Sequence, residues 1–144
     1  MVKNINRTIW IIRIIPGLVF LLEGIQKFTR ADSLGVGRFM NIGIPHAAFW
    51  GPFVGVVEIV CGSLLLIGLF ARLATIPLII DMICAFIYTK WPILVDKGFF
   101  PMFHDYRTDF AMTLCLVFLL MAGPGYYALD NQIHKPKRKG DSPI

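Results

Sequence analysis

The chain has 144 residues and a formal net charge of +5, but only 16% of its residues are charged and 56% are hydrophobic. A soluble domain is nearer half apolar and a quarter charged, and one domain of this length could not bury four long apolar runs. The composition therefore excludes an ordinary soluble enzyme and predicts an all-α integral membrane protein.

Four apolar runs, some extended by flanking residues, are long enough to cross a bilayer. A helix rises about 1.5 Å per residue, and the hydrocarbon core is roughly 30 Å thick. The predicted spans are residues 8–28, 51–71, 73–91 and 104–123. The link at Gly68–Arg72 is so short that the second and third helices must be antiparallel neighbours. We therefore predict a left-handed four-helix antiparallel bundle in one domain, residues 1–134, followed by a basic tail, residues 135–144.

The first run is interpreted as a retained helix rather than a signal peptide, because it is too long and contains Arg13 and Glu23. Pro16 predicts a kink. Arg13 lies near one end, from which it can reach the lipid headgroups. Glu23 and Lys27 are four residues apart, which suits an ion pair on one helix face.

Two connecting segments are unusually apolar or aromatic. The loop 29–50 contains VGRFMNIGIP, which is too apolar for a free loop and too short to span, so it predicts a re-entrant or interfacial segment. The aromatic-rich segment 92–107 is predicted to lie at a membrane interface. The last apolar run, 110–122, is short, so its helix must begin near Phe103 to span.

The stretch 51–72 organises the chain, because one buried acid, Glu58, shares a helix face with several glycines. Glycine lets a second helix approach closely in lipid, and an intramembrane carboxyl group must face protein or water. This face therefore points into the bundle, and the first helix carries a similar stripe. The predicted helix-packing glycines are Gly17, Gly24, Gly51, Gly55 and Gly62.

Antiparallel packing brings a set of polar groups to similar depths, and they form the predicted ligand or polar pocket. The set consists of Glu23, Lys27, Glu58, Asp81 and Asp109. One interpretation is an outward-opening pocket for a quinone headgroup, a proton path or a small solute. The other is a structural ion pair of Lys27 with Glu23 or Glu58, with Asp109 at the interface. The scarcity of nearby cations favours function for Glu58 and Asp81, whereas structure is favoured for Lys27 and Asp109.

Several chemistries do not match the sequence. The three cysteines form no C-x-x-C pair, and the three histidines lie in loops and tail, where they could not hold a transmembrane haem. No metal site and no covalent cofactor are predicted. The basic tail is interpreted as a contact with anionic lipid rather than with nucleic acid.

Short motifs in a fixed order point to a family. They are Arg13–Gly17, Gly24–Lys27, Gly43-Ile44-Pro45, Gly55-x-x-Glu58-x-x-x-Gly62, Gly68…Arg72, and Gly123-Pro124-Gly125 before Leu129-Asp130. With these motifs the chain resembles the DoxX family of small four-helix membrane proteins over nearly its whole length. The resemblance implies a bacterial inner (plasma) membrane protein, in some members a subunit of quinone-linked oxidoreductases such as thiosulfate:quinone oxidoreductase. The chain departs from the family pattern at two positions. Family members often have Glu or Asn where this chain has Asp109, and commonly a basic residue where it has Tyr126.

Two functional hypotheses follow. The first is a subunit of, or partner to, a quinone-linked redox complex, with quinone as the candidate cofactor. The second is a non-enzymatic scaffold or assembly factor that binds a partner through its glycine-lined faces. Expected partners are the lipid bilayer, another membrane protein and, in a homo-oligomer, a second copy. Seven Lys and Arg residues on the side of the termini, against six on the other, favour both termini in the cytoplasm.

Overall fold

The structure is a computed structural model that describes residues 2–133. The predicted basic tail, residues 135–144, lies outside the described residues. Within the described part every regular element is a helix, which confirms the all-α prediction. The elements are α1 (Val2–Thr29), α2 (Val36–Asn41), α3 (Ala47–Ile67), α4 (Ala71–Ala85), η1 (Phe86–Lys90), α5 (Trp91–Lys97), α6 (Phe99–Ala122) and α7 (Leu129–Ile133).

Three helices in residues 2–133 are long and apolar enough to cross a membrane. They are Arg7–Thr29, Ala47–Ile67 and Ala71–Lys97. These helices match the first three predicted spans in number and order. The fourth predicted span, 104–123, is helical within α6, but its first half carries Asp105, Arg107 and Asp109, and α6 is not among the three. The four-helix membrane bundle stays a prediction.

The predicted interfacial segment 92–107 is helical, and the predicted end of the third helix at Trp91 is wrong. α4, the π-helical turn η1 and α5 form one continuous helix that ends at Lys97. Pro92 lies inside this continuous helix, two residues after η1 ends. Only Gly98 separates α5 from α6, and its φ of 88° favours glycine.

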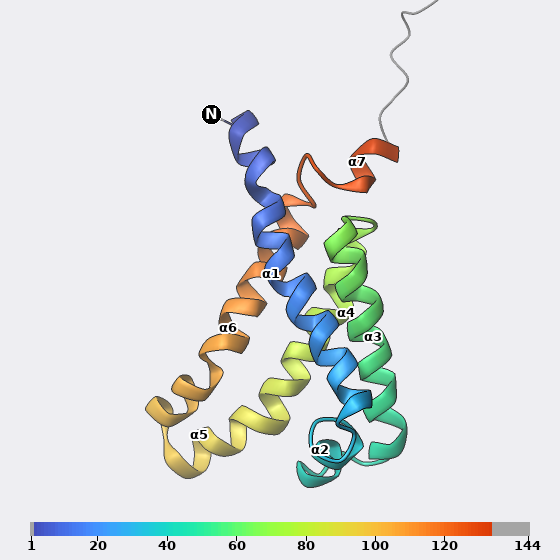
Figure 1. Cartoon of the computed structure of the whole chain (residues 1–144). Helices are drawn as coiled ribbons and strands as arrows, with labels where there is room; N and C mark the ends of the chain where they lie inside the picture. Colours follow the sequence, from blue (N-terminus) through green and yellow to red (C-terminus); the bar gives the residue numbers. More distant parts are fainter. Residues whose placement is uncertain (1, 134–144) are drawn as a thin grey trace, which may run out of the picture.

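The main helices alternate in direction (Figure 1). α1 packs most extensively against α3, α4 returns beside α3, and α6 packs against α4 and α1. The start of α1, the turn between α3 and α4, and α7 lie at one end of the molecule, which we call the terminal end. α2 and the turn between α5 and α6 lie at the opposite end, where α5 and the beginning of α6 diverge from α1 and α3.

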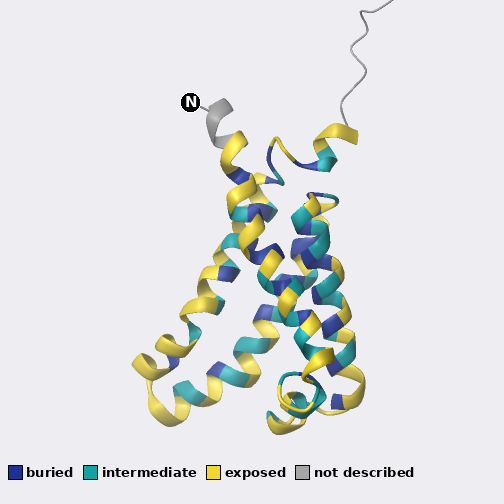
Figure 2. Cartoon of the chain, in the orientation of Figure 1, coloured by how far each residue is buried: buried dark blue, intermediate teal, exposed yellow. Residues whose placement is uncertain are grey.

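The buried core lies where α3, α4 and α6 meet α1, toward the terminal end and the middle (Figure 2). Its fully buried side chains include Leu65, Leu78, Leu116 and Leu119, each 0% exposed. Large aliphatic side chains such as Leu18, Val60 and Ile80 point outward. A surface covered by such side chains is stable in lipid rather than in water, which agrees with a helical membrane protein.

Close backbone contact between α1 and α3 depends on glycine. A Cβ atom added to Gly62 would lie 2.7 Å from the backbone nitrogen of Leu21, and one added to Gly24 would lie 2.7 Å from the carbonyl oxygen of Gly55. Gly17 lies near the Gly62 carbonyl oxygen, and Gly51 faces the backbone of Val36 in α2. Any larger residue would push the backbones apart.

The prediction that Arg13 reaches the lipid headgroups is wrong. Its side chain is buried, with 4% of the residue exposed, and donates hydrogen bonds to the carbonyl oxygens of Pro124 (2.8 Å) and Tyr127 (3.4 Å). The turn at Gly123–Gly125 carries these carbonyl groups back over α1, because both glycines have positive φ. Asp130 interacts electrostatically with Arg13 and accepts hydrogen bonds from the backbone N–H groups of Phe70 and Ala71, at the start of α4. Arg13 and Asp130 thus hold the segment after α6, and α7, against α1 and the start of α4 at the terminal end.

Candidate functional site

The first ion pair joins α1 to the middle of α3. Lys27 Nζ lies 2.6 Å from Glu58 Oε2, and the two side chains are 12% and 5% exposed. Gly55, one turn before Glu58, makes this approach possible, since a Cβ atom there would lie 3.3 Å from Lys27 Cβ. Of the two partners that the sequence offered to Lys27, the structure selects Glu58. Glu23 is partly exposed and makes no ion pair within residues 2–133.

Asp81 brings a second carboxyl group to Glu58 from α4. Asp81 interacts electrostatically with Lys27, Glu58 and Asp109. One ammonium group therefore faces two carboxyl groups in the middle of the helix bundle, where a negative charge is least well solvated.

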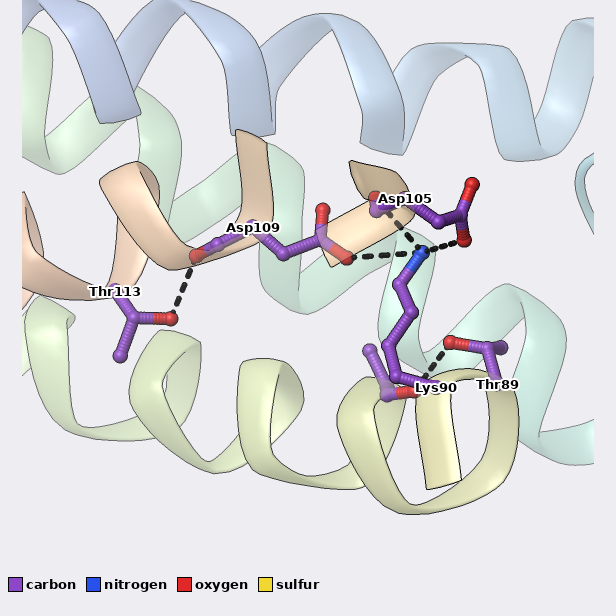
Figure 3. A network of polar contacts seen from close by, with 6 residues as sticks. Thr89, Lys90, Asp105, Asp109 and Thr113 are labelled. Carbon is purple, nitrogen blue, oxygen red and sulfur yellow. Dashed lines mark hydrogen bonds and ion pairs between the residues drawn. The ribbon is translucent and has the colours of Figure 1, made fainter. Parts of the chain in front are cut away.

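A second ion-pair cluster contains a residue that the sequence analysis did not select, Lys90. Figure 3 shows Lys90 from η1 between Asp105 and Asp109 of α6. Its Nζ atom lies 2.6 Å from Asp105 Oδ2 and 3.4 Å from Asp109 Oδ2. The Lys90 side chain is 9% exposed, whereas those of Asp105 and Asp109 are 54% and 32% exposed. Asp109 is therefore paired rather than a lone interfacial acid.

The π-helical turn explains why Lys90 was missed. In an uninterrupted α-helix, nine residues rotate by about 900°, which puts Lys90 on the face opposite Asp81. One π-turn takes up one extra residue, which leaves the two positions about 80° apart. Pro92 gives a local cause, because it has no N–H for the carbonyl group of Tyr88. In the sequence, the signal for the π-turn was Pro92, four residues after Tyr88.

The two clusters together form a charged track across five helical elements, α1, α3, α4, η1 and α6. It runs from Lys27 through Glu58 and Asp81 to Asp109, and then through Lys90 to the exposed Asp105. We call these six residues the charged track. It contains two ammonium groups against four carboxyl groups, so Lys90 supplies a cation that the sequence analysis did not place near these acids.

The surroundings of the track contain no cluster suited to a metal ion: among residues 2–133, no three His, Cys, Asp or Glu side chains come together for that purpose. A surface cavity of about 360 Å³ lies at the terminal end, lined by Tyr126, Tyr127, Asn131 and Gln132. This cavity is therefore separate from the charged track.

These features define a class: a helical membrane protein with charged side chains paired between its helices. The family follows from comparison with known proteins. The DoxX family model matches residues 8–91, and the chain belongs to the DoxX family.

An uncharacterized membrane protein of Mycobacterium tuberculosis is 52% identical over 130 residues, covering 86% of this chain and 80% of the relative. A protein of Bacillus subtilis named "putative oxidoreductase CatD" is 25% identical over 131 residues, covering 91% of this chain and 90% of the relative. No solved structure matches the chain.

Proposed function

We propose that this DoxX-family protein is a membrane subunit of, or partner to, a quinone-linked redox complex, and that Glu58 and Asp81 exchange protons with the quinone. Reduction of a quinone to a quinol consumes two electrons and two protons. The electrons come from a redox partner of the complex, and the protons need carriers inside the bilayer. The name of the Bacillus subtilis relative supports a redox setting.

The observation that carries the proposal is the Glu58 carboxyl group, which is 5% exposed and shared between Lys27 and Asp81. Lys27 can neutralise only one of the two carboxylates, and we propose that the other carries a proton. Paired titratable groups in a desolvated site are the usual arrangement for proton exchange with a ligand. A purely structural ion pair would need only one of the two acids.

The test compares Glu58→Gln, Lys27→Met and the double variant after purification in mild detergent. We expect Glu58→Gln to keep size and hydrogen bonding, so that its melting temperature stays near the parent's while its bound quinone falls about tenfold. Glu23→Gln is the matched control, because Glu23 makes no ion pair in the described residues, and it should bind quinone like the parent.

Two results would contradict this proposal. If both single variants lose stability and the double variant recovers it with quinone content unchanged, the pair is structural. If the parent itself purifies without quinone, the scaffold or assembly-factor alternative replaces the redox function.

We further propose that the protein crosses the bacterial inner membrane four times, with α6 as the fourth span and both termini in the cytoplasm. The termini of the described chain lie at the same end (Figure 1), as an even number of spans requires. In a variant without its native cysteines, Ser33→Cys should react with an impermeant maleimide in intact cells. Gln132→Cys should react only after permeabilisation. Labelling of both positions from one side would rule out this topology.

A further inference from the structure

We propose that the cavity at the terminal end is a binding site for the phosphate group of an anionic membrane phospholipid, with Arg7 as its cationic residue. The cavity has a volume of about 360 Å³ and is lined by Tyr126, Tyr127, Asn131 and Gln132. This volume lies within the usual range for small-molecule sites. The inference goes beyond the proposed function, because it concerns a second site and needs neither quinone nor the charged track.

The positive charge beside the cavity comes from α1. Arg7 is exposed, and its guanidinium carbon lies 5.7 Å from the ring centroid of Tyr126, one of the lining residues. Within residues 2–133 Arg7 makes no ion pair, so no carboxylate there competes with a ligand for it. A guanidinium group presents its N–H donors in one plane and can bind a phosphate group through two of them. The aromatic ring thus holds a phosphate-binding group at the edge of the cavity.

The cavity lies at the level where the helices leave the bilayer. The first candidate span begins at Arg7, the second ends at Ile67 and the third begins at Ala71. These three positions lie at the terminal end, together with α7 (Figure 1). Tyrosine side chains are enriched at this depth, because the ring is apolar and the hydroxyl group is polar. The phosphate groups of phospholipids lie at the same depth, so we assign the cavity to a lipid rather than to a free anion.

Hydrogen bonds from side chains hold the walls of the cavity in place. Arg13 donates to the carbonyl oxygens of Pro124 (2.8 Å) and Tyr127 (3.4 Å). The Asn131 side-chain amide donates to the carbonyl oxygen of Gly125, at 2.6 Å. The segment that lines the cavity is therefore fixed before a ligand arrives, which lowers the entropic cost of binding.

The acid that lies within the lining segment in sequence, Asp130, is directed toward α4. Its carboxylate oxygens accept hydrogen bonds from the backbone N–H groups of Phe70 (2.8 Å) and Ala71 (3.1 Å), and Asp130 is not among the lining residues. The lining side chains are phenols and amides, which can donate hydrogen bonds to a phosphate oxygen. An anion in the cavity therefore meets neutral donors and the Arg7 cation rather than a carboxylate.

The experiment measures phospholipid binding to the full chain in mild detergent by native mass spectrometry. Phosphatidylglycerol, which is anionic, is titrated beside zwitterionic phosphatidylcholine, and we expect the parent to prefer phosphatidylglycerol. Arg7→Met should weaken phosphatidylglycerol binding at least about fivefold. Its melting temperature should stay near the parent's, because Arg7 is exposed. Arg7→Lys should restore only part of the binding, since an ammonium group is a point charge without the planar fork of donors.

Arg30→Met is the matched control, because Arg30 is an exposed arginine just beyond the other end of α1. It removes the same charge and should bind phosphatidylglycerol like the parent. The basic residues in 135–139 are retained in every variant, so any attraction that they exert on anionic lipid is common to all. Tyr126→Leu is a second test variant, which removes the ring beside Arg7 at a half-exposed position and should also weaken binding.

Equal losses in Arg7→Met and Arg30→Met would show a general attraction between charges and overturn the site. Parental binding in both Arg7→Met and Tyr126→Leu would overturn it as well, and so would a parent that binds the two lipids equally. Inorganic phosphate is added as a competitor. Displacement of phosphatidylglycerol by millimolar phosphate would show a site for the free anion and contradict the assignment to a lipid, whereas retention of the lipid supports it.

Discussion

Replacing Gly62 by leucine is expected to separate α1 from α3 and to lower the free energy of unfolding by about 3 kcal/mol or more. The clash is with backbone rather than with movable side chains, because a Cβ atom there would lie 2.7 Å from Leu21 N and 2.9 Å from Gly17 O. The separation also moves Lys27 away from Glu58. Thermal melting in mild detergent, followed by size-exclusion chromatography, measures the effect.

Val60→Leu is the matched control, because Val60 lies on the same helix with 49% of its residue surface exposed. An added methylene at this outward position should leave the melting temperature unchanged, and Gly62→Ala should fall between the two. A Gly62→Leu protein that melts like the parent would show that α1 and α3 do not make the contact described.

Arg13→Met should be comparably destabilising, by about 3–5 kcal/mol, because it strands buried polar partners. The carbonyl oxygens of Pro124 and Tyr127 would lose their donor, and Asp130 would lose the charge of Arg13. We expect a lower melting temperature and faster proteolysis near the Gly123–Gly125 turn, which measures release of α7.

The control for Arg13 is a second arginine on the same helix. Arg7 is exposed and lies 5.7 Å from the ring centroid of Tyr126, a contact that contributes about 0.5–1 kcal/mol at an exposed site. Arg7→Met should therefore change stability only slightly. Equal, small losses in both variants would mean that Arg13 does not hold the terminal end together.

The sequence predicts three of the candidate spans in number and order, because length and hydropathy decide them, but not their bounds: the second helix is Ala47–Ile67 rather than 51–71. It also places the glycines and Glu58 on one face, since that result needs only the helical period. The continuation of the third helix through Pro92 to Lys97 was missed. Proline and the aromatic residues around it usually indicate a helix end, and the π-turn through which this helix continues is seen only in the structure.

Partners across helices were harder to predict than positions along them. The choice between Glu23 and Glu58 for Lys27 depends on the register of α1 against α3, which no local pattern contains. Arg13 is buried because the distant Gly123–Gly125 turn folds back over α1. The position of Lys90 beside the acids could not be predicted for another reason. The helix face on which it lies depends on a π-turn, which a fixed helical period does not describe.

The π-turn at Phe86–Lys90 also has an evolutionary consequence. A single π-turn is equivalent to a one-residue insertion in an α-helix. A homologue with one residue fewer here would restore the plain α-helix and turn every following side chain by about 100° relative to the helix before it. Gap placement at this site in family alignments should therefore decide which member residue corresponds to Lys90.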